Sequence, residues 1–127
     1  MPAVSNSSPL ISFAAIGRLE LLRNVYHEIL VPPAVWRETV SRGAGRPGSA
    51  ELQNVDWIRL LAPTAPNMAR ITPADLGEGE TEAIALALST RPSATVILDD
   101  LPARRVALRA GLDVAGSGGV VILAKEL

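Results

Sequence analysis

The sequence predicts an α/β fold in which helices pack on a mainly parallel sheet. Short apolar segments alternate with longer amphipathic segments along the chain, which is the pattern of repeated β–α units. Hydrophobic residues make up 48% of the chain but aromatic residues only 3%. The core must therefore consist of Leu, Ile, Val and Ala, which suits helices packed on a buried parallel sheet. The 127 residues fit a single domain, 1–127.

The first elements follow from local start and stop signals. Pro2–Ser5 is short and apolar, which favours a strand. Ser8 as N-cap and Pro9 in the first helical position predict a helix, and Gly17 predicts its end. The apolar spacing over Leu19–Val25 predicts a second short helix.

The middle of the chain continues the alternation. Glu28–Val31 is predicted to be a strand, and Pro33–Thr39 a helix that begins at its proline. The segment 41–49 (SRGAGRPGS) is rich in Gly, Ser and Arg, which predicts a surface loop. It is not a domain boundary, because each flank is too short to fold alone. Trp57–Leu61 is predicted to be a strand, and Ala62–Ile71 irregular.

The C-terminal half repeats the same units. Asp75–Ser89 is predicted to be a helix because its apolar residues fall on one face. A fully apolar strand over Thr95–Leu98 and a helix over Pro102–Ala110 follow. A strand over Leu112–Ala115 and a last helix over Gly118–Lys125 complete the series.

The charge balance excludes some classes of function. With 12 basic and 13 acidic residues the formal net charge is −1, so a nucleic-acid role must come from a local site. No cysteine is present, which excludes disulfides and thiolate metal sites and is compatible with a cytoplasmic location. No apolar run has the length of a membrane span, and no signal peptide is evident.

Polar residues follow two predicted strands. One group is Ser5–Ser8, and the other is Asp99 and Asp100, directly after an apolar strand. Functional residues gather at the carboxyl ends of parallel strands, and adjacent carboxylates there are suited to a hard cation such as Mg²⁺. The alternative is that the two aspartates begin a loop and cap the next helix.

Three glutamates on predicted helices are further candidates. Glu80 extends the apolar stripe of its helix instead of the solvent face, so it must be paired, metal-bound or protonated. Glu82 has a more mixed face, and Glu38 lies one turn after apolar positions and can point inward. The alternatives are that acids in a first turn stabilise the helix N-terminus, and that Glu38 is simply solvated.

Taken together, five segments resemble the PIN domain, and most closely its VapC-like toxin ribonuclease branch. They are VSNSSPLISFAAIGRLELL, ILVPPAVWRE, GEGETEAIALAL, VILDDLPARRVALRAGL and DVAGSGGVVILAK. The resemblance covers nearly the whole chain in the family's order. It implies a PIN-like α/β/α sandwich, in which helices cover both faces of a mainly parallel central sheet. It also implies an acidic site that binds Mg²⁺ or Mn²⁺ for RNA cleavage.

The resemblance assigns the catalytic and metal-binding acids by position. They fall on Asn6, Glu38, Glu80 and either Asp99 or Asp100. Glu82 matches a second acid often seen in this branch. An RNA substrate, an antitoxin partner and a homodimer are implied by the family alone.

Other residues are candidates for binding phosphate. The helix N-termini near Ser8 and Gly79 present backbone N–H groups for an anion. Arginines that are candidates for contacts to the RNA backbone are Arg42, Arg46, Arg104, Arg105 and Arg109. The alternative for each arginine is an ordinary solvated surface. His27, the only histidine, is interpreted as structural or exposed.

The chain departs from the family pattern at two places. Asn6 stands where the family normally has aspartate, which removes an anionic ligand and predicts weaker metal binding and strongly reduced cleavage. The chain ends at Leu127, whereas resembling proteins usually continue, so we expect a C-terminal extension to be missing.

Two further hypotheses remain open. One is a non-catalytic module that keeps the fold and binds RNA or a partner protein. The other is a receiver-like phospho-acceptor, suggested only by acids at strand ends; it lacks a lysine at a later strand end, because Lys125 lies inside the last predicted helix.

Overall fold

A computed structural model describes residues 2–41, 48–71 and 76–127. Its centre is a five-stranded sheet with the order β3-β2-β1-β4-β5, in which every neighbouring pair is parallel. The strands are β1 (Ala3–Ser5), β2 (Ile29–Val31), β3 (Ile58–Leu60), β4 (Thr95–Ile97) and β5 (Val114–Ala115). All five lie within the segments predicted to be strands, and the predicted α/β architecture is confirmed.

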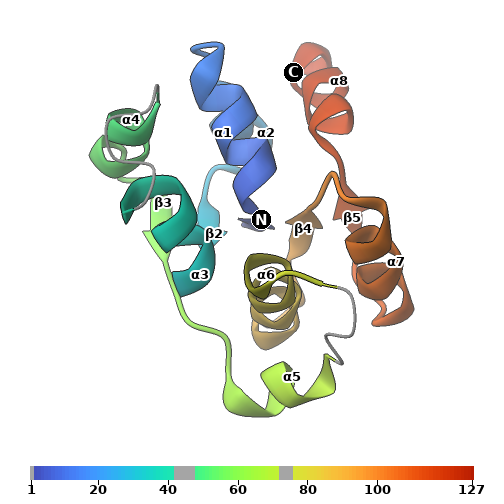
Figure 1. The fold of residues 1–127 in the computed structure, drawn as a ribbon. Helices are drawn as coiled ribbons and strands as arrows, with labels where there is room; N and C mark the ends of the chain where they lie inside the picture. The colour runs from blue at the N-terminus through green and yellow to red at the C-terminus, as the bar shows by residue number, and fades with distance from the viewer. Residues whose placement is uncertain (1, 42–47, 72–75) are drawn as a thin grey trace.

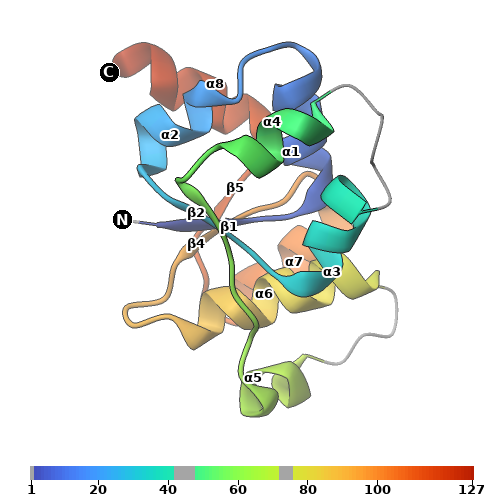
Figure 2. The same cartoon turned by 90° about the vertical axis from the view of Figure 1, so that its left-hand side faces the viewer.

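Helices cover both faces of the sheet. They are α1 (Ser7–Ala15), α2 (Glu20–Tyr26), α3 (Pro33–Trp36), α4 (Ser49–Asn54), α5 (Ala65–Arg70), α6 (Glu78–Ser89), α7 (Leu101–Arg109) and α8 (Ser117–Glu126). A π-helical segment, η1 (Arg37–Ser41), continues α3 without a break. Helices α1, α2 and α8 lie on one face, whereas α6 and α7 lie on the other with α5 beyond them (Figures 1 and 2).

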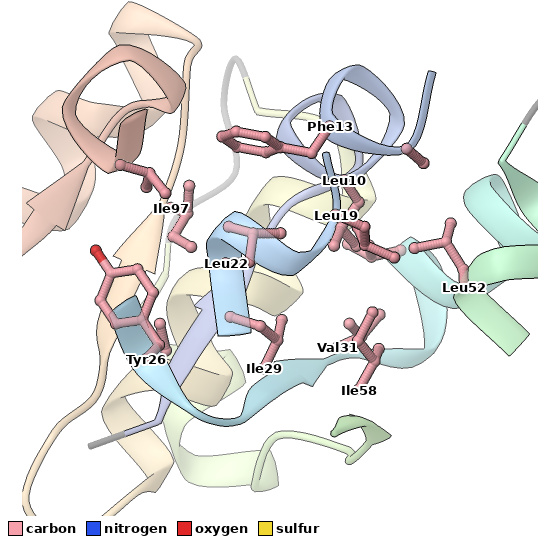
Figure 3. Close-up of a cluster of buried hydrophobic side chains, with 14 of the residues drawn as sticks. Leu10, Phe13, Leu19, Leu22, Tyr26, Ile29, Val31, Leu52, Ile58 and Ile97 are labelled. Atoms are coloured by element: carbon pink, nitrogen blue, oxygen red, sulfur yellow. The ribbon is translucent and has the colours of Figure 1, made fainter. Parts of the chain in front are cut away.

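The sheet divides the core into two clusters. Alternate strand residues point to opposite faces, so Ala3, Ile29 and Ile97 join one cluster, whereas Val4 and Leu30 join the other. Figure 3 shows the first cluster, in which side chains from α1, α2 and α4 pack on strand residues. The second cluster is built from α6, α7 and the opposite face of the strands. The predicted aliphatic core is therefore present on both faces of the sheet.

The structure corrects several predicted boundaries near the N-terminus. Helix α1 begins at Ser7 with Asn6 as N-cap, so Ser8 is not the N-cap and Pro9 is not the first helical residue. The helix predicted from Pro33 divides into α3 and η1. Asn6 and Ser7, which directly follow β1, therefore lie at the very start of α1, at the carboxyl end of the strand.

Two helices were not predicted. Helix α4 begins at Ser49, at the end of the segment predicted to be a loop; residues 42–47 of that segment lie outside the described residues. Helix α5 lies where an irregular segment was predicted, and the Thr64 side chain caps it by accepting the Asn67 N–H at 3.4 Å. Because α5 has no buried residue, it shows no apolar periodicity to reveal it.

The remaining boundaries move little. Helix α6 begins at Glu78, and Asp75 lies outside the described residues. Helix α7 begins at Leu101, one residue before the predicted start, and α8 begins at Ser117. The part of the chain that the structure describes contains no helix long and apolar enough to cross a membrane.

Candidate active site

The carboxyl ends of β1 and β4 form one side of an acidic pocket of about 280 Å³. Four separate parts of the chain surround it: the start of α1, η1, the start of α6 and the segment after β4. Its lining residues are Asn6, Ser7, Ser8, Glu38, Gly77, Gly79, Glu80 and Asp100. Four of the residues that the sequence singled out are thus brought together.

Asn6 is held in the pocket by its own backbone. Its N–H donates to the Ile97 carbonyl at 3.1 Å, which joins the end of β1 to the end of β4. Asn6 is buried, with 7% of its surface exposed, and its side chain makes no capping hydrogen bond to α1. The amide is therefore placed for contacts within the pocket and not for closing the helix.

Glu38 is oriented by a serine of α1. The Oγ of Ser7 donates to Oε2 of Glu38 at 2.6 Å. The other oxygen, Oε1, faces the start of α6, where a Cβ placed on Gly79 would lie 3.0 Å from it. The same point lies 3.4 Å from Oδ1 of Asn6. The absence of a side chain at Gly79 therefore lets two oxygen ligands approach the N-terminus of α6.

Glu80 lies half-buried in the first turn of α6. Its Oε1 accepts the backbone N–H of Gly77 at 3.1 Å, as in a capping box. Burial raises the pKa of Glu80; the Gly77 N–H opposes this, and the nearby carboxylates of Asp100 and Glu38 raise the pKa further. Glu80 therefore interacts with two neighbouring carboxylates, and a cation bound beside it would offset the cost of its negative charge.

The adjacent aspartates have different surroundings. Asp100 lines the pocket, and its Oδ2 caps α7 by accepting the Ala103 N–H at 3.1 Å. Asp99 turns to α8: Oδ1 accepts the Ser117 N–H at 2.8 Å, and Oδ2 accepts the Ser117 hydroxyl at 2.6 Å. Of the two residues that the sequence left open, Asp100 lies in the pocket and Asp99 holds the start of α8.

Glu82 also has a partner outside the pocket. Its Oε1 accepts the backbone N–H of Ala34 at 2.9 Å, so it contacts the first turn of α3. Ser7 was part of the polar group Ser5–Ser8 but was assigned no role from the sequence, and Gly77 was not singled out; both line the pocket. The contact of Ser7 could not be inferred from local sequence, because its partner Glu38 is 31 positions away. Gly77 instead contacts Glu80 in the same helical turn.

The predicted phosphate-binding residues are dispersed. Ser8 is exposed and lines the pocket. Arg104 reaches Gly116 near Asp99, where its Nη1 lies 2.7 Å from the position of an added Cβ. Arg105 is exposed on α7 and does not line the pocket. Arg42 and Arg46 lie outside the described residues, and His27 is exposed at the end of α2.

A second pocket, of about 310 Å³, lies between α5, α6 and α7. It is lined by Arg70, Ile71, Leu88, Val106, Arg109 and Ala110. Both arginines are in the last turns of their helices, where the helix dipole stabilises a cation. None of the described residues that line this pocket is acidic, whereas three carboxylates line the pocket around Glu80.

The acidic pocket fits a hard divalent cation in its donor types. Three carboxylates and one amide supply oxygen ligands, which Mg²⁺ and Mn²⁺ prefer. Within residues 2–41, 48–71 and 76–127, no three acidic or histidine side chains are already grouped to hold one metal ion. Mg²⁺ often binds through one or two carboxylates and completes its shell with water, which is the mode that suits this pocket.

Comparisons with known proteins agree with this architecture. The profile of the family DUF3368, described as a PIN domain, matches residues 2–127. A similar solved structure is that of a PilT N-terminus domain protein, SSO1118, from the hyperthermophilic archaeon Sulfolobus solfataricus P2. The two are 16% identical with a TM-score of 0.67, over 100% of this chain and 96% of that chain. No curated protein gave a significant match. The likeness in structure shows a shared fold, and the profile match shows that the chain belongs to the PIN-domain family, whose fold is of nuclease type.

Proposed function

We propose that this PIN domain is a metal-dependent endoribonuclease whose site is the acidic pocket. The observation that carries the proposal is the convergence of Asn6, Glu38, Glu80 and Asp100 from four segments on one pocket. The raised pKa of Glu80 supports it, because carboxylates that repel one another provide a site for a cation. A cation bound at such a site can stabilise the negative charge that develops on the phosphate during hydrolysis of a phosphodiester.

Each residue has a separate part in the proposed reaction. Glu80 and Asp100 would hold Mg²⁺ or Mn²⁺, with the Asn6 amide as a neutral ligand. When bound, the cation makes water a better nucleophile and stabilises charge on the phosphate. Oε1 of Glu38 is the free oxygen that accepts a proton from the attacking water, because Oε2 is occupied by Ser7.

Binding of the RNA strand would use groups around the pocket. Ser8, at the start of α1, offers N–H and hydroxyl donors for a phosphate at the helix N-terminus. Arg104, near the same end of the sheet, and Arg105 would contact neighbouring phosphates. With few aromatic residues available to stack bases, phosphate contacts and shape would dominate recognition.

A role as the toxin of a toxin–antitoxin pair in the cytoplasm extends the proposal. It rests on the resemblance to the VapC-like branch. Exposed aliphatic side chains at the end of α1 and on α8 offer contact area for an antitoxin or for a homodimer: Ile16, which follows α1, is 67% exposed and Ile122 62%. Co-purification with the product of an adjacent gene would test this part separately from catalysis.

Asn6 favours a second candidate function, a non-catalytic PIN-fold module that binds RNA or a partner protein. An amide keeps one oxygen of an aspartate but loses its charge, so cation binding and cleavage would be weakened. The two candidate functions predict different results for a negative charge at position 6: it should increase cleavage by a ribonuclease but produce no cleavage in a binding module.

The experiment compares the native chain with Asn6→Asp on a labelled single-stranded RNA in Mn²⁺, Mg²⁺ and EDTA. We expect metal-dependent cleavage that is at least ten times faster with Asn6→Asp and is abolished by adding Asp100→Asn. Asn24→Asp, an exposed asparagine on α2, is the matched control and should change nothing. RNA binding without cleavage in Asn6→Asp would favour the non-catalytic module.

A further inference from the structure

Glu82 contacts the backbone of α3, not the pocket. Its carboxylate accepts the Ala34 N–H at 2.9 Å, across 48 residues of sequence. We infer that Glu82 is a positioning residue that anchors the start of α3 and thereby places Glu38 at the pocket. The effect of Glu82 on catalysis rests on the proposed function. The anchoring of α3 by Glu82 does not.

The start of α3 lacks a local cap. Its N-cap is Pro32, which offers no side-chain acceptor, and Pro33 in the first turn has no N–H. The first N–H available is that of Ala34, a residue only 2% exposed. A buried donor needs a partner within the protein, and Glu82 supplies that partner as a charged acceptor at the positive end of the helix.

The link from this anchor to Glu38 is short. Helix α3 has only four residues and passes directly into η1, so Glu38 follows Ala34 by four residues. A helix of that length does not hold its position alone. Its orientation must come from the elements against which it packs, and α3 lies beside α6 in both views (Figures 1 and 2).

Helix α6 holds this segment at three successive points. At the exposed end, Glu78 accepts a hydrogen bond from Arg37 at 2.6 Å, within an ion pair. In the middle, the Cβ position of Gly79 lies 3.3 Å from Cγ2 of Val35. At the inner end, Glu82 binds Ala34. The exposed ion pair contributes little, so the half-buried bond of Glu82 is the main polar anchor.

The hydrogen bond to Ala34 requires an acceptor oxygen at residue 82, but it does not require a negative charge there. Glu82→Gln keeps an oxygen at the same place, whereas Glu82→Met has similar length and no acceptor of comparable strength. A positioning residue should therefore tolerate glutamine and not methionine. A metal ligand should behave differently, since glutamine removes the anionic charge that a hard cation requires.

The test measures metal-free protein first, by NMR. In Glu82→Met we expect exchange of the Ala34 amide to accelerate at least tenfold and the NOE between the Val35 methyl and Gly79 Hα to weaken. In Glu82→Gln both should stay within threefold of the native protein. Val120→Ala, a core substitution in α8, is the control for general destabilisation and should leave the Val35–Gly79 contact intact.

Mn²⁺ titration and RNA cleavage, both in the Asn6→Asp background, form the second arm. Glu82→Gln should retain Mn²⁺ affinity within twofold, whereas Glu80→Gln should lose it. Glu82→Met should reduce kcat about tenfold per folded molecule.

Two outcomes would overturn the inference. One is unchanged exchange of the Ala34 amide in Glu82→Met, and the other is a loss of Mn²⁺ affinity in Glu82→Gln equal to that in Glu80→Gln. Absence of cleavage in every variant would refute the ribonuclease proposal and leave the NMR result standing. If Glu82→Met does not fold, amide exchange in the native protein and in Glu82→Gln tests the anchoring instead. Slower exchange at Ala34 than at the first-turn amides of other helices would support the anchor, and equally fast exchange would refute it.

Discussion

The hydroxyl of Ser7 donates a 2.6 Å hydrogen bond to Oε2 of Glu38, and so joins the first turn of α1 to η1. The two residues are 31 positions apart in sequence. Ser7 is buried, next to Asn6 at the end of β1. The bond leaves Oε1 of Glu38 as the oxygen facing the start of α6, and this division of the two oxygens is the basis of the first prediction.

Ser7→Ala should release the Glu38 carboxylate. We expect a loss of about 1–2 kcal/mol in the free energy of unfolding, because a hydrogen bond to a charged group is lost while the carboxylate can still reach water. Cleavage by the Asn6→Asp protein should fall about tenfold if Glu38 acts as the proton acceptor. Urea unfolding and RNA cleavage check the two parts. Ser12→Ala, at an exposed position of the same helix, should alter neither.

Glu80→Gln should stabilise the metal-free protein at neutral pH. The folded pKa of Glu80 is raised above its ordinary value of 4.5. The stability linked to its proton is therefore present below that value and is lost as the pH rises through the folded pKa. Glutamine keeps the capping bond to Gly77 without the charge. Thermal unfolding in EDTA should give a higher Tm than the native chain at pH 7.

The same comparison at low pH is the control for this prediction. Below pH 4 the native glutamic acid is itself neutral, so the difference in Tm should largely disappear. Glu51→Gln, an exposed acid on α4, should show no comparable gain at pH 7. A lower Tm for Glu80→Gln at pH 7 would show that the carboxylates of the pocket do not repel one another in the folded protein.

Gly79→Ala should destabilise the protein although alanine is the better helix former. The added Cβ would lie 3.0 Å from Oε1 of Glu38 and 3.3 Å from Cγ2 of Val35. We expect a net loss of about 1–3 kcal/mol from overpacking, measured by urea unfolding. Gly118→Ala is the matched control, since nothing lies within 4 Å of its Cβ position in α8. That substitution should be neutral or stabilise by up to about 1 kcal/mol.

Asp99 and Asp100 should respond differently to loss of charge. In Asp99→Asn the amide oxygen can still accept the Ser117 N–H, so α8 stays anchored and Mn²⁺ affinity changes little. Asp100→Asn should weaken Mn²⁺ binding at least tenfold. Asp99→Ala, by contrast, should accelerate amide exchange at the start of α8 and cost about 1–2 kcal/mol. A strong loss of Mn²⁺ affinity in Asp99→Asn would assign Asp99 to the metal site.

Much of the fold follows from local sequence. Each strand was predictable, because runs such as Val96-Ile97-Leu98 are apolar on both faces and too short for a helix. Glu80 was singled out from the helical period, and the structure places it beside the pocket, although α6 is buried on all sides over residues 83–88 and has no single apolar stripe. Helix α5 was not, because it buries no residue and its stability comes from capping at Thr64 and from contacts with α6.

The oxygen-bearing residues at the ends of strands and helices, and hence the candidate acids, can be identified from the amino-acid sequence. The direction in which each carboxylate points depends on contacts that form only in the folded protein. Asp99 turns to Ser117, 18 positions away, and Glu82 turns to Ala34, 48 positions away. A carboxylate takes the direction of the nearest unsatisfied donor, and that donor comes from another segment. That donor reaches the carboxylate only after the sheet has brought the two segments together.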